Sequence, residues 1–163
     1  MKIAIAFLAM FSMSTFAADI PIVGNVESKC IITTDTEGVY GNSTSSNLST
    51  DAADGDVEPI VKFDVLQADA YKALISHPTS FSQSPTLSDT TTWTGSTSVD
   101  QVSDTNMSSY DTDKVTYNNT TEYDLTVAGT TWFKVSSEVD YGYSKAFPAG
   151  TYRALVEAEC IAQ

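Results

Sequence analysis

Positively charged side chains and histidine are scarce in this sequence. It has 8 lysines and arginines against 21 aspartates and glutamates, a single histidine, and a formal net charge of −13 at pH 7. Nucleic acid, itself a polyanion, is therefore a poor partner for this chain, and anionic membranes are disfavoured for the same reason. A charge of this sign suits solubility or the binding of divalent cations.

Motifs of catalysis are also missing. His77 is the only imidazole, and Pro78 follows it in a polar stretch. The sequence has no nucleophile elbow and no glycine-rich phosphate loop, whereas an enzyme needs a convergent set of acid, base or nucleophile groups. We therefore expect that the protein is not an enzyme and that His77 is a surface-loop residue.

Cysteine is limited to Cys30 and Cys160, one near each end of the chain. In an oxidising compartment an even pair of cysteines predicts a disulfide. Two free thiols are the alternative, and a metal site is disfavoured because there is only one histidine to join them. A bridge would close a loop of roughly 130 residues, for which the chain-entropy relation gives about 4–5 kcal/mol of stabilisation.

Long hydrophobic runs are absent apart from one at the start. Met1 and Lys2 precede an apolar run over residues 3–11, and small residues follow it up to Ala17. This pattern predicts a secretory signal over residues 1–17, cut after Ala17 or one residue later. A retained membrane anchor is the alternative, but the run is shorter than the about 20 residues that a span requires. Residues 18–163 fit one secreted domain.

Apolar residues alternate with polar ones at both ends of the remaining chain. Near its start these residues are Ile20, Ile22, Val26, Cys30 and Ile32, and near its end they are Tyr152, Ala154, Val156, Ala158 and Cys160. Alternate residues of a strand point to the same face, so both cysteines are expected on core faces. The first and last strands should then lie close, as neighbours or across two facing sheets.

The middle of the sequence predicts several more strands, at residues 60–66, 93–99, 115–117, 123–127 and 131–141, the last two joined as a hairpin around Gly129. Residues 68–75 predict one or two helical turns, and residues 41–56 and 79–113 are expected to be mostly loops. Many short strands with polar turns and no regular helix favour an all-β fold of one domain, a β-sandwich.

Two groups of acidic residues are candidate calcium ligands, because carboxylates in a loop can wrap a hard cation. The better group is Asp51, Asp54, Asp56 and Glu58. A looser group is Asp104, Asp111 and Asp113. The spacing of the first group does not match an EF-hand, and a solvated acidic loop without a metal is the alternative.

The two ends of the chain together resemble a bacterial fimbrial (pilin) subunit of the chaperone–usher type. Residues 20–30 read Ile-Pro-Ile-Val-Gly-Asn-Val-Glu-Ser-Lys-Cys, and residues 148–156 are similar to the family's turn and closing strand. The resemblance implies an incomplete immunoglobulin-like β-sandwich whose subunits lend an N-terminal strand to a neighbour's groove.

Two features differ from the common subunits of that family. There the disulfide joins two positions in the first half of the domain, whereas Cys30 and Cys160 would tie the first strand to the last. The segment before Cys30 is also short. Either the chain belongs to a divergent branch, or it is a self-contained sandwich with its own closing strand.

The first functional hypothesis is therefore a structural subunit of a surface filament, found in the periplasm or at the cell surface. Its assembly strand would carry Ile20, Ile22 and Val26, and its partners would be other copies, sister subunits and a periplasmic chaperone. The second hypothesis is a monomeric extracellular adhesin that binds a glycan or a surface protein. Exposed aromatic rings would then stack on sugar, and the candidates are Trp93, Tyr110 and Tyr117. A secreted hydrolase or inhibitor is a third.

Overall fold

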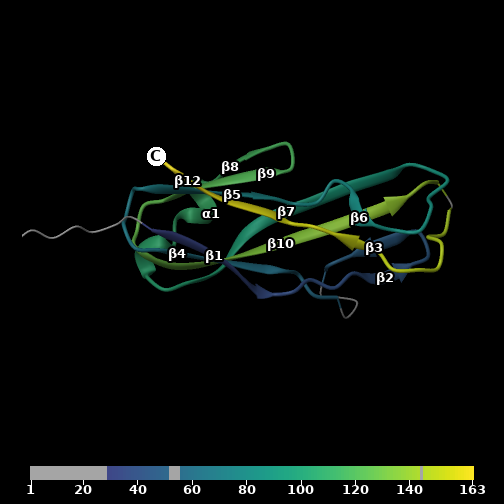
Figure 1. Ribbon diagram of the computed structural model, residues 1–163, viewed down its shortest axis with the longest axis horizontal. Coiled ribbons are helices and arrows are strands. Elements are labelled where there is room, and N and C mark those ends of the chain that lie inside the picture. The colour runs from purple at the N-terminus through teal and green to yellow at the C-terminus, as the bar shows by residue number, and fades with distance from the viewer. Residues whose placement is uncertain (1–28, 52–55, 144) are drawn as a thin grey trace, which may run out of the picture.

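The computed structural model describes residues 29–51, 56–143 and 145–163. In these ranges the chain is mostly β-structure in antiparallel sheets, with one short α-helix (Figure 1). That helix, α1, spans Tyr110–Asp113, and a 3-10 helix, η2, spans Thr105–Met107. No helix within the described ranges is long and apolar enough to cross a bilayer. The predicted signal, the segment with Ile20, Ile22 and Val26, and Asp54 lie outside the described residues.

The larger sheet is organised around β10 (Gly129–Tyr141). Along one side, β10 pairs with β7 (Thr91–Val102), and along the other it pairs first with β4 (Ile60–Val65) and then with β3 (Asn47–Ser49). β1 (Cys30–Thr36) pairs with β4, and β2 (Gly41–Thr44) pairs with β3. The long central strand forms because every second residue of β10 from Thr131 onward is buried, which is the periodicity of a strand with one face in the core.

A four-stranded sheet has the order β12-β5-β9-β8. These strands span Glu157–Ala162, Tyr71–Ser76, Thr120–Leu125 and Val115–Tyr117 respectively. Their inward residues are apolar or hydroxyl-bearing, and Ala73, Ile75, Tyr123 and Leu125 are buried. β6 (Phe81–Gln83) and β11 (Arg153–Ala154) form a separate two-stranded pair.

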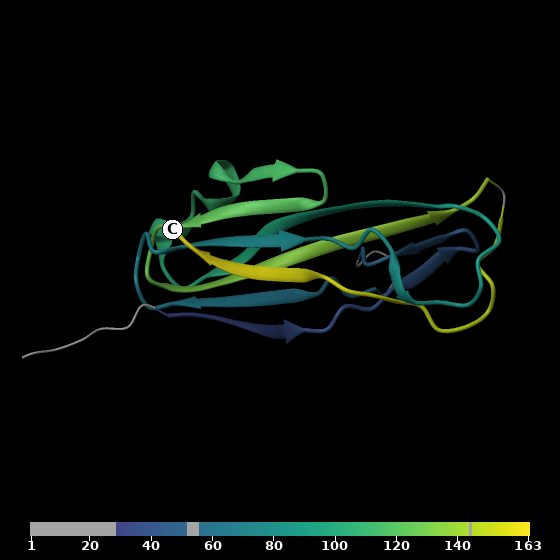
Figure 2. The ribbon, with the colours of Figure 1, turned by 45° about the horizontal axis from the view of Figure 1, so that its top comes forward.

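The two larger sheets pack against each other through aromatic side chains. The ring centroid of Phe133 in β10 lies 4.4 Å from that of Tyr123 in β9 and 5.4 Å from that of Phe63 in β4. Figure 2 shows β9 and β5 on one side of this core and β4 and β1 on the other. The buried core consists of Val61, Phe63, Val65, Ala73, Ile75, Met107, Tyr110, Tyr123, Leu125, Phe133 and Val135.

A second aromatic cluster lies at the end of the molecule opposite the C-terminus, near β6 (Figure 1). The Phe81 ring lies 4.7 Å from the Trp93 ring and 5.1 Å from the Tyr152 ring, centroid to centroid. Phe147 contacts Tyr152 and stacks on Tyr141. The Tyr152 hydroxyl also donates to the Pro148 carbonyl oxygen at 2.7 Å. These contacts fix the chain just before β11.

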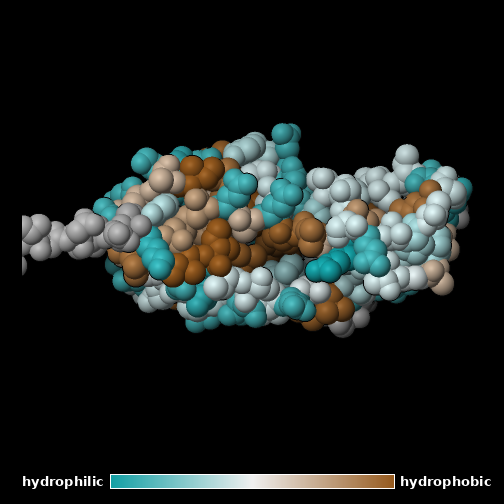
Figure 3. Space-filling model, viewed as in Figure 1, coloured by the Kyte–Doolittle hydropathy of each residue, from teal (hydrophilic) through white to brown (hydrophobic). Residues whose placement is uncertain are grey.

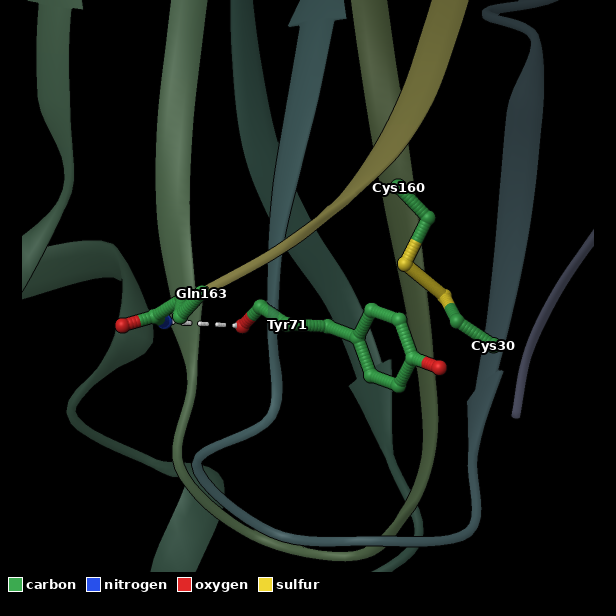
Figure 4. Close-up of a disulfide and its surroundings, with 4 residues drawn as sticks. All are labelled: Cys30, Tyr71, Cys160 and Gln163. Atoms are coloured by element: carbon green, nitrogen blue, oxygen red, sulfur yellow. Dashed lines mark hydrogen bonds between the residues drawn. A yellow bond between two sulfur atoms is a disulfide. The ribbon is translucent and has the colours of Figure 1, made fainter. Parts of the chain in front are cut away.

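The predicted disulfide between Cys30 and Cys160 is confirmed. Cys30 is the first residue of β1 and Cys160 lies in β12, so the bridge joins one strand of each large sheet. Figure 4 shows the Tyr71 ring beside the bridge, and the Gln163 side chain donates to the Tyr71 carbonyl oxygen at 3.1 Å. A single disulfide is consistent with a protein that works outside the reducing cytoplasm.

The prediction of helical turns at residues 68–75 is wrong, because Tyr71–Ser76 is strand β5. Ala73 and Ile75 are fully buried, while Leu74 between them faces outward beside Glu159 and Glu122 of the adjacent strands. Asp69 has a φ of +56°, a left-handed conformation that a right-handed helix does not accommodate.

The predicted hairpin around Gly129 is also wrong. β9 pairs with β5 and β8, whereas β10 pairs with β3, β4 and β7, so the two strands belong to different sheets. Gly129 is the residue where the chain enters the larger sheet, and its φ of +142° favours glycine.

The stretches expected to be loops contain strands. Residues 79–113 include β6 and the twelve-residue β7, and residues 41–56 include β2 and β3. β7 is rich in threonine, which is polar by composition but β-branched and suited to a strand. The predicted mostly-β architecture is confirmed even so, and residues 153–162 carry the predicted closing strand as β11 and β12.

Replacing both cysteines by serine (C30S/C160S) should lower the free energy of unfolding by about 4–5 kcal/mol, because the bridge spans 130 residues and constrains the unfolded chain. Urea unfolding followed by tyrosine fluorescence measures the change. Reduction of the wild-type protein is the matched control and should lower the midpoint equally. An unchanged midpoint in both would contradict the stabilising role of the bridge.

Candidate functional site

Of the strands with one unpaired edge, β1 and β12 are the two that the disulfide connects. Among the described residues, β1 pairs only with β4, and β12 pairs only with β5. The two strands belong to different sheets, and the disulfide joins them at one end. Main-chain donors and acceptors on such edges are free to pair with a further strand.

A groove opens between these strands as they leave the disulfide. β1 runs from Cys30 toward Thr36, and the C-terminal segment leads back from Cys160 toward Val156. The groove has a volume of about 820 Å³ and begins at Thr34 on one side and Val156 on the other. Thr34 lies in β1 four positions after Cys30, and Val156, which directly precedes β12, lies four positions before Cys160, so the groove does not reach the bridge.

The groove has two walls and a floor. One wall follows the end of β1 and the segment after it, with Thr34, Thr36, Glu37, Gly38, Val39 and Tyr40. The other wall follows the C-terminal segment, with Gly150, Tyr152, Arg153, Ala154, Leu155 and Val156. The floor consists mainly of Leu48, Thr50, Pro59, Ile60, Val61 and Ser137.

Apolar side chains beside this groove are incompletely buried. Ile32, Val156 and Ala158 pack against the core but are only partly covered. Val39 on one wall is 51% exposed, and Leu155 on the other wall is 55% exposed. Figure 3 shows hydrophobic side chains gathered between β12 and β1, where the surface is hollowed. A contiguous apolar hollow of this kind is typical of an interaction site.

Tyr40 places a hydroxyl group in the groove. Its oxygen lies 2.7 Å from Ser137 Oγ in β10, and either group can donate. Burial raises the pKa of Tyr40 above its ordinary value, and the hydrogen bond to Ser137 opposes this in part. The hydroxyl is therefore a neutral polar group of the groove wall that bonds to Ser137 in the floor.

The described members of the first acidic group have different environments. Asp51 is exposed, Asp56 is 5% exposed, and the Glu58 carboxylate lies 3.3 Å from Lys134 Nζ. Within the described ranges no group of three or more acidic, histidine or cysteine side chains is placed to hold a metal ion. Because Asp54 lies outside those ranges, calcium binding by this segment stays a prediction.

The looser acidic group has local structural contacts. Asp104 caps η2, since its Oδ1 accepts from the Asn106 backbone N–H at 2.8 Å. Asp111 accepts from the Val99 backbone N–H and pairs with Lys114. Asp113 is exposed at the end of α1. These three residues therefore serve different segments of the chain.

The three aromatic residues predicted to stack on sugar have different environments. Trp93 is half-buried and packs against Phe81, with its indole N–H donating to Thr91 Oγ1 at 3.0 Å. The expectation that Tyr110 is exposed is wrong, since it is 3% exposed and its hydroxyl accepts from the Val127 backbone N–H. Tyr117 is 44% exposed on β8. The structure does not bring the three rings together on one surface.

Sequence reasoning missed the walls of the groove. One available signal was Leu155, an apolar residue at a position of the last strand where Arg153, Glu157 and Glu159 are otherwise polar. Val39 gave no comparable signal, because it lies in a segment that pairs only through a single bridge with Val57.

Comparison of the chain with protein-family models, with curated proteins and with solved structures gives no significant match.

Ionisation of Tyr40 tests its place in the groove. Because burial disfavours the phenolate, Tyr40 should titrate above the ordinary value of about 10, and stability present below pH 10 should be lost as the pH rises through the folded pKa. The ultraviolet titration curve of Tyr40→Phe should lack one of the tyrosine ionisations that the wild-type protein shows above the ordinary pKa. Tyr143→Phe, which removes a 96% exposed ring, is the control, and loss of the same transition there would contradict the assignment.

Proposed function

We propose that the protein is a structural subunit of a secreted surface filament, which assembles when a strand of one copy enters the groove of another. We also propose that the two facing sheets form an incomplete immunoglobulin-like sandwich. The observation that supports both proposals is the groove between the end of β1 and residues 150–156, the segment that leads into β12, with exposed apolar side chains on both walls. We assign no catalysis to this subunit.

Main-chain hydrogen bonding supports strand addition at this place. A strand in the groove would lie between the end of β1 and residues 150–156, and if it continued toward the disulfide it would reach the free edges of β1 and β12. Proteins commonly block such edges, and edges left open are used for pairing with another chain. Apolar side chains of the entering strand would complete the cover over Ile32, Val156 and Ala158.

Residues 18–28 have the composition that this groove requires. Ile20, Ile22 and Val26 are spaced at even intervals along the sequence, so they would point to one face of an extended strand. Eleven residues reach about 36 Å when extended at about 3.3 Å per residue. Burial of each large aliphatic side chain is worth about 1.5–3 kcal/mol. Three such side chains therefore provide a substantial driving force for insertion.

The chain connection favours a second copy as the donor. Residues 18–28 join β1 at Lys29 and Cys30, the end where the disulfide holds β1 and β12 together. The groove lies at the opposite end of β1, beside Thr34 and Thr36. A chain that used its own segment would have to reverse direction within the few residues before Cys30. A segment from another copy can enter without this reversal.

The alternative function is a monomeric module that binds a glycan or a surface protein. It draws on the exposed ring of Tyr117, near the exposed Val115 on the same edge strand. Trp93 and Tyr110 support it less, because the first packs against Phe81 and the second is buried. The groove supports strand addition more directly.

Replacing Ile22 by Asp should abolish filament assembly, because a charged carboxylate would enter the apolar groove. The domain should still fold, since residue 22 precedes β1. Electron microscopy and sedimentation measure assembly, and circular dichroism measures folding. When mixed with wild-type protein, this variant should still accept a strand and so stop growth.

Val23→Asp is the matched control for that variant. It adds the same charge to the same segment, but residue 23 has the opposite parity and should face away from the groove. We expect assembly to be retained. Normal filaments from Ile22→Asp, or equal loss from both variants, would contradict strand insertion with the proposed register.

A further inference from the structure

The long strand β7 has an unpaired edge on which side chains bond two backbone groups, the Val99 N–H and the Thr97 carbonyl oxygen. β7 pairs with β10 over its full length, and no other described strand pairs with it. From Thr91 to Val99 it contains threonine, serine, tryptophan, glycine and valine, with no charged residue and no proline. A long uncharged edge strand of high β-propensity is a template for unwanted pairing.

Three side chains occupy the outward backbone groups in the middle of this edge. Both carboxylate oxygens of Asp111 accept from the Val99 backbone N–H, at 3.0 and 3.1 Å. Lys114 Nζ donates to the Thr97 carbonyl oxygen at 2.7 Å, and the Tyr123 hydroxyl donates to the same oxygen at 2.9 Å. An N–H and a carbonyl that a further strand would use are thereby already bonded.

Asp111 and Lys114 also contact each other. Lys114 Nζ lies 3.1 Å from Asp111 Oδ1, so the acceptor for Val99 and the donor to Thr97 form one ion pair. The pair provides an acceptor and a donor side by side, as the backbone of a neighbouring strand would.

The segment that carries these side chains is anchored in the core. Met107 is 1% exposed and Tyr110 is 3% exposed, and both belong to the buried cluster between the sheets. The Tyr110 hydroxyl accepts from the Val127 backbone N–H at 3.1 Å, and the Lys114 backbone N–H donates to the Tyr110 carbonyl oxygen at 3.1 Å. α1 therefore holds Asp111 and Lys114 at the edge of β7.

We propose that Asp111 and Lys114 form an edge cap that prevents β7 from pairing with a strand of a second copy. The cap directs association away from β7. This role does not depend on the proposed filament function, because an uncapped β7 would pair whether or not the groove accepts a strand.

The test uses the full mature chain carrying Ile22→Asp, so that insertion into the groove does not contribute to association. In this background we expect most of the D111A/K114A protein to associate at concentrations where the parent remains monomeric. Size-exclusion chromatography with light scattering measures the monomer fraction. Asp111→Ala alone keeps Lys114 and Tyr123 as donors to Thr97, and it provides a milder variant if the double variant does not fold.

Asp113→Ala is the matched control, because it removes one carboxylate from the same helix without touching β7. It should remain monomeric. Amide hydrogen exchange at Val99 locates the contact: in the associated D111A/K114A protein, Val99 should be protected again by the new strand. Two results would overturn the proposal. One is a monomeric D111A/K114A protein with fast exchange at Val99, and the other is equal association of Asp113→Ala.

Discussion

A single covalent bond joins the edges of two sheets that share no hydrogen-bonded ladder over the part of the chain that the structure describes. Cys30 begins β1 and Cys160 lies in β12, and these strands pair with β4 and β5 respectively. The bridge therefore fixes the separation of the two edges at one end of the molecule. Farther along, the edges are free to diverge, and the groove lies there. The position of the bridge decides where the core is incompletely covered.

The aromatic cluster near β6 provides the second fixed point of the groove. Tyr152 packs against Phe81 and Phe147, and this contact fixes the C-terminal segment beside β6. Between the bridge and this cluster, the chain keeps Leu155 exposed on one wall and Val39 on the other. The exposed apolar side chains of the two walls therefore lie between these two anchors.

The alternation of apolar and polar residues predicted the terminal strand β12, the inward orientation of both cysteines and their disulfide. These properties depend only on that alternation and on residue type. The same alternation did not show whether two strands that follow each other in the sequence belong to one sheet or to two. The alternation before and after Gly129 is equally compatible with a hairpin and with a crossing between sheets. The burial of Tyr110 was also not predictable, since it depends on the long-range contact of its hydroxyl with Val127. The groove combines residues more than 100 positions apart, and no local pattern marks such a set.

The central claim is that residue 22 of one copy lies in the groove of another. A photo-crosslinking amino acid at position 22, in an equal mixture of unlabelled and 15N-labelled protein, tests it directly by mass spectrometry. The account predicts crosslinked peptides of mixed isotope content that join residue 22 to the groove walls at residues 34–40 or 150–156. Crosslinks only within single-isotope chains, or to peptides outside the groove, would contradict it.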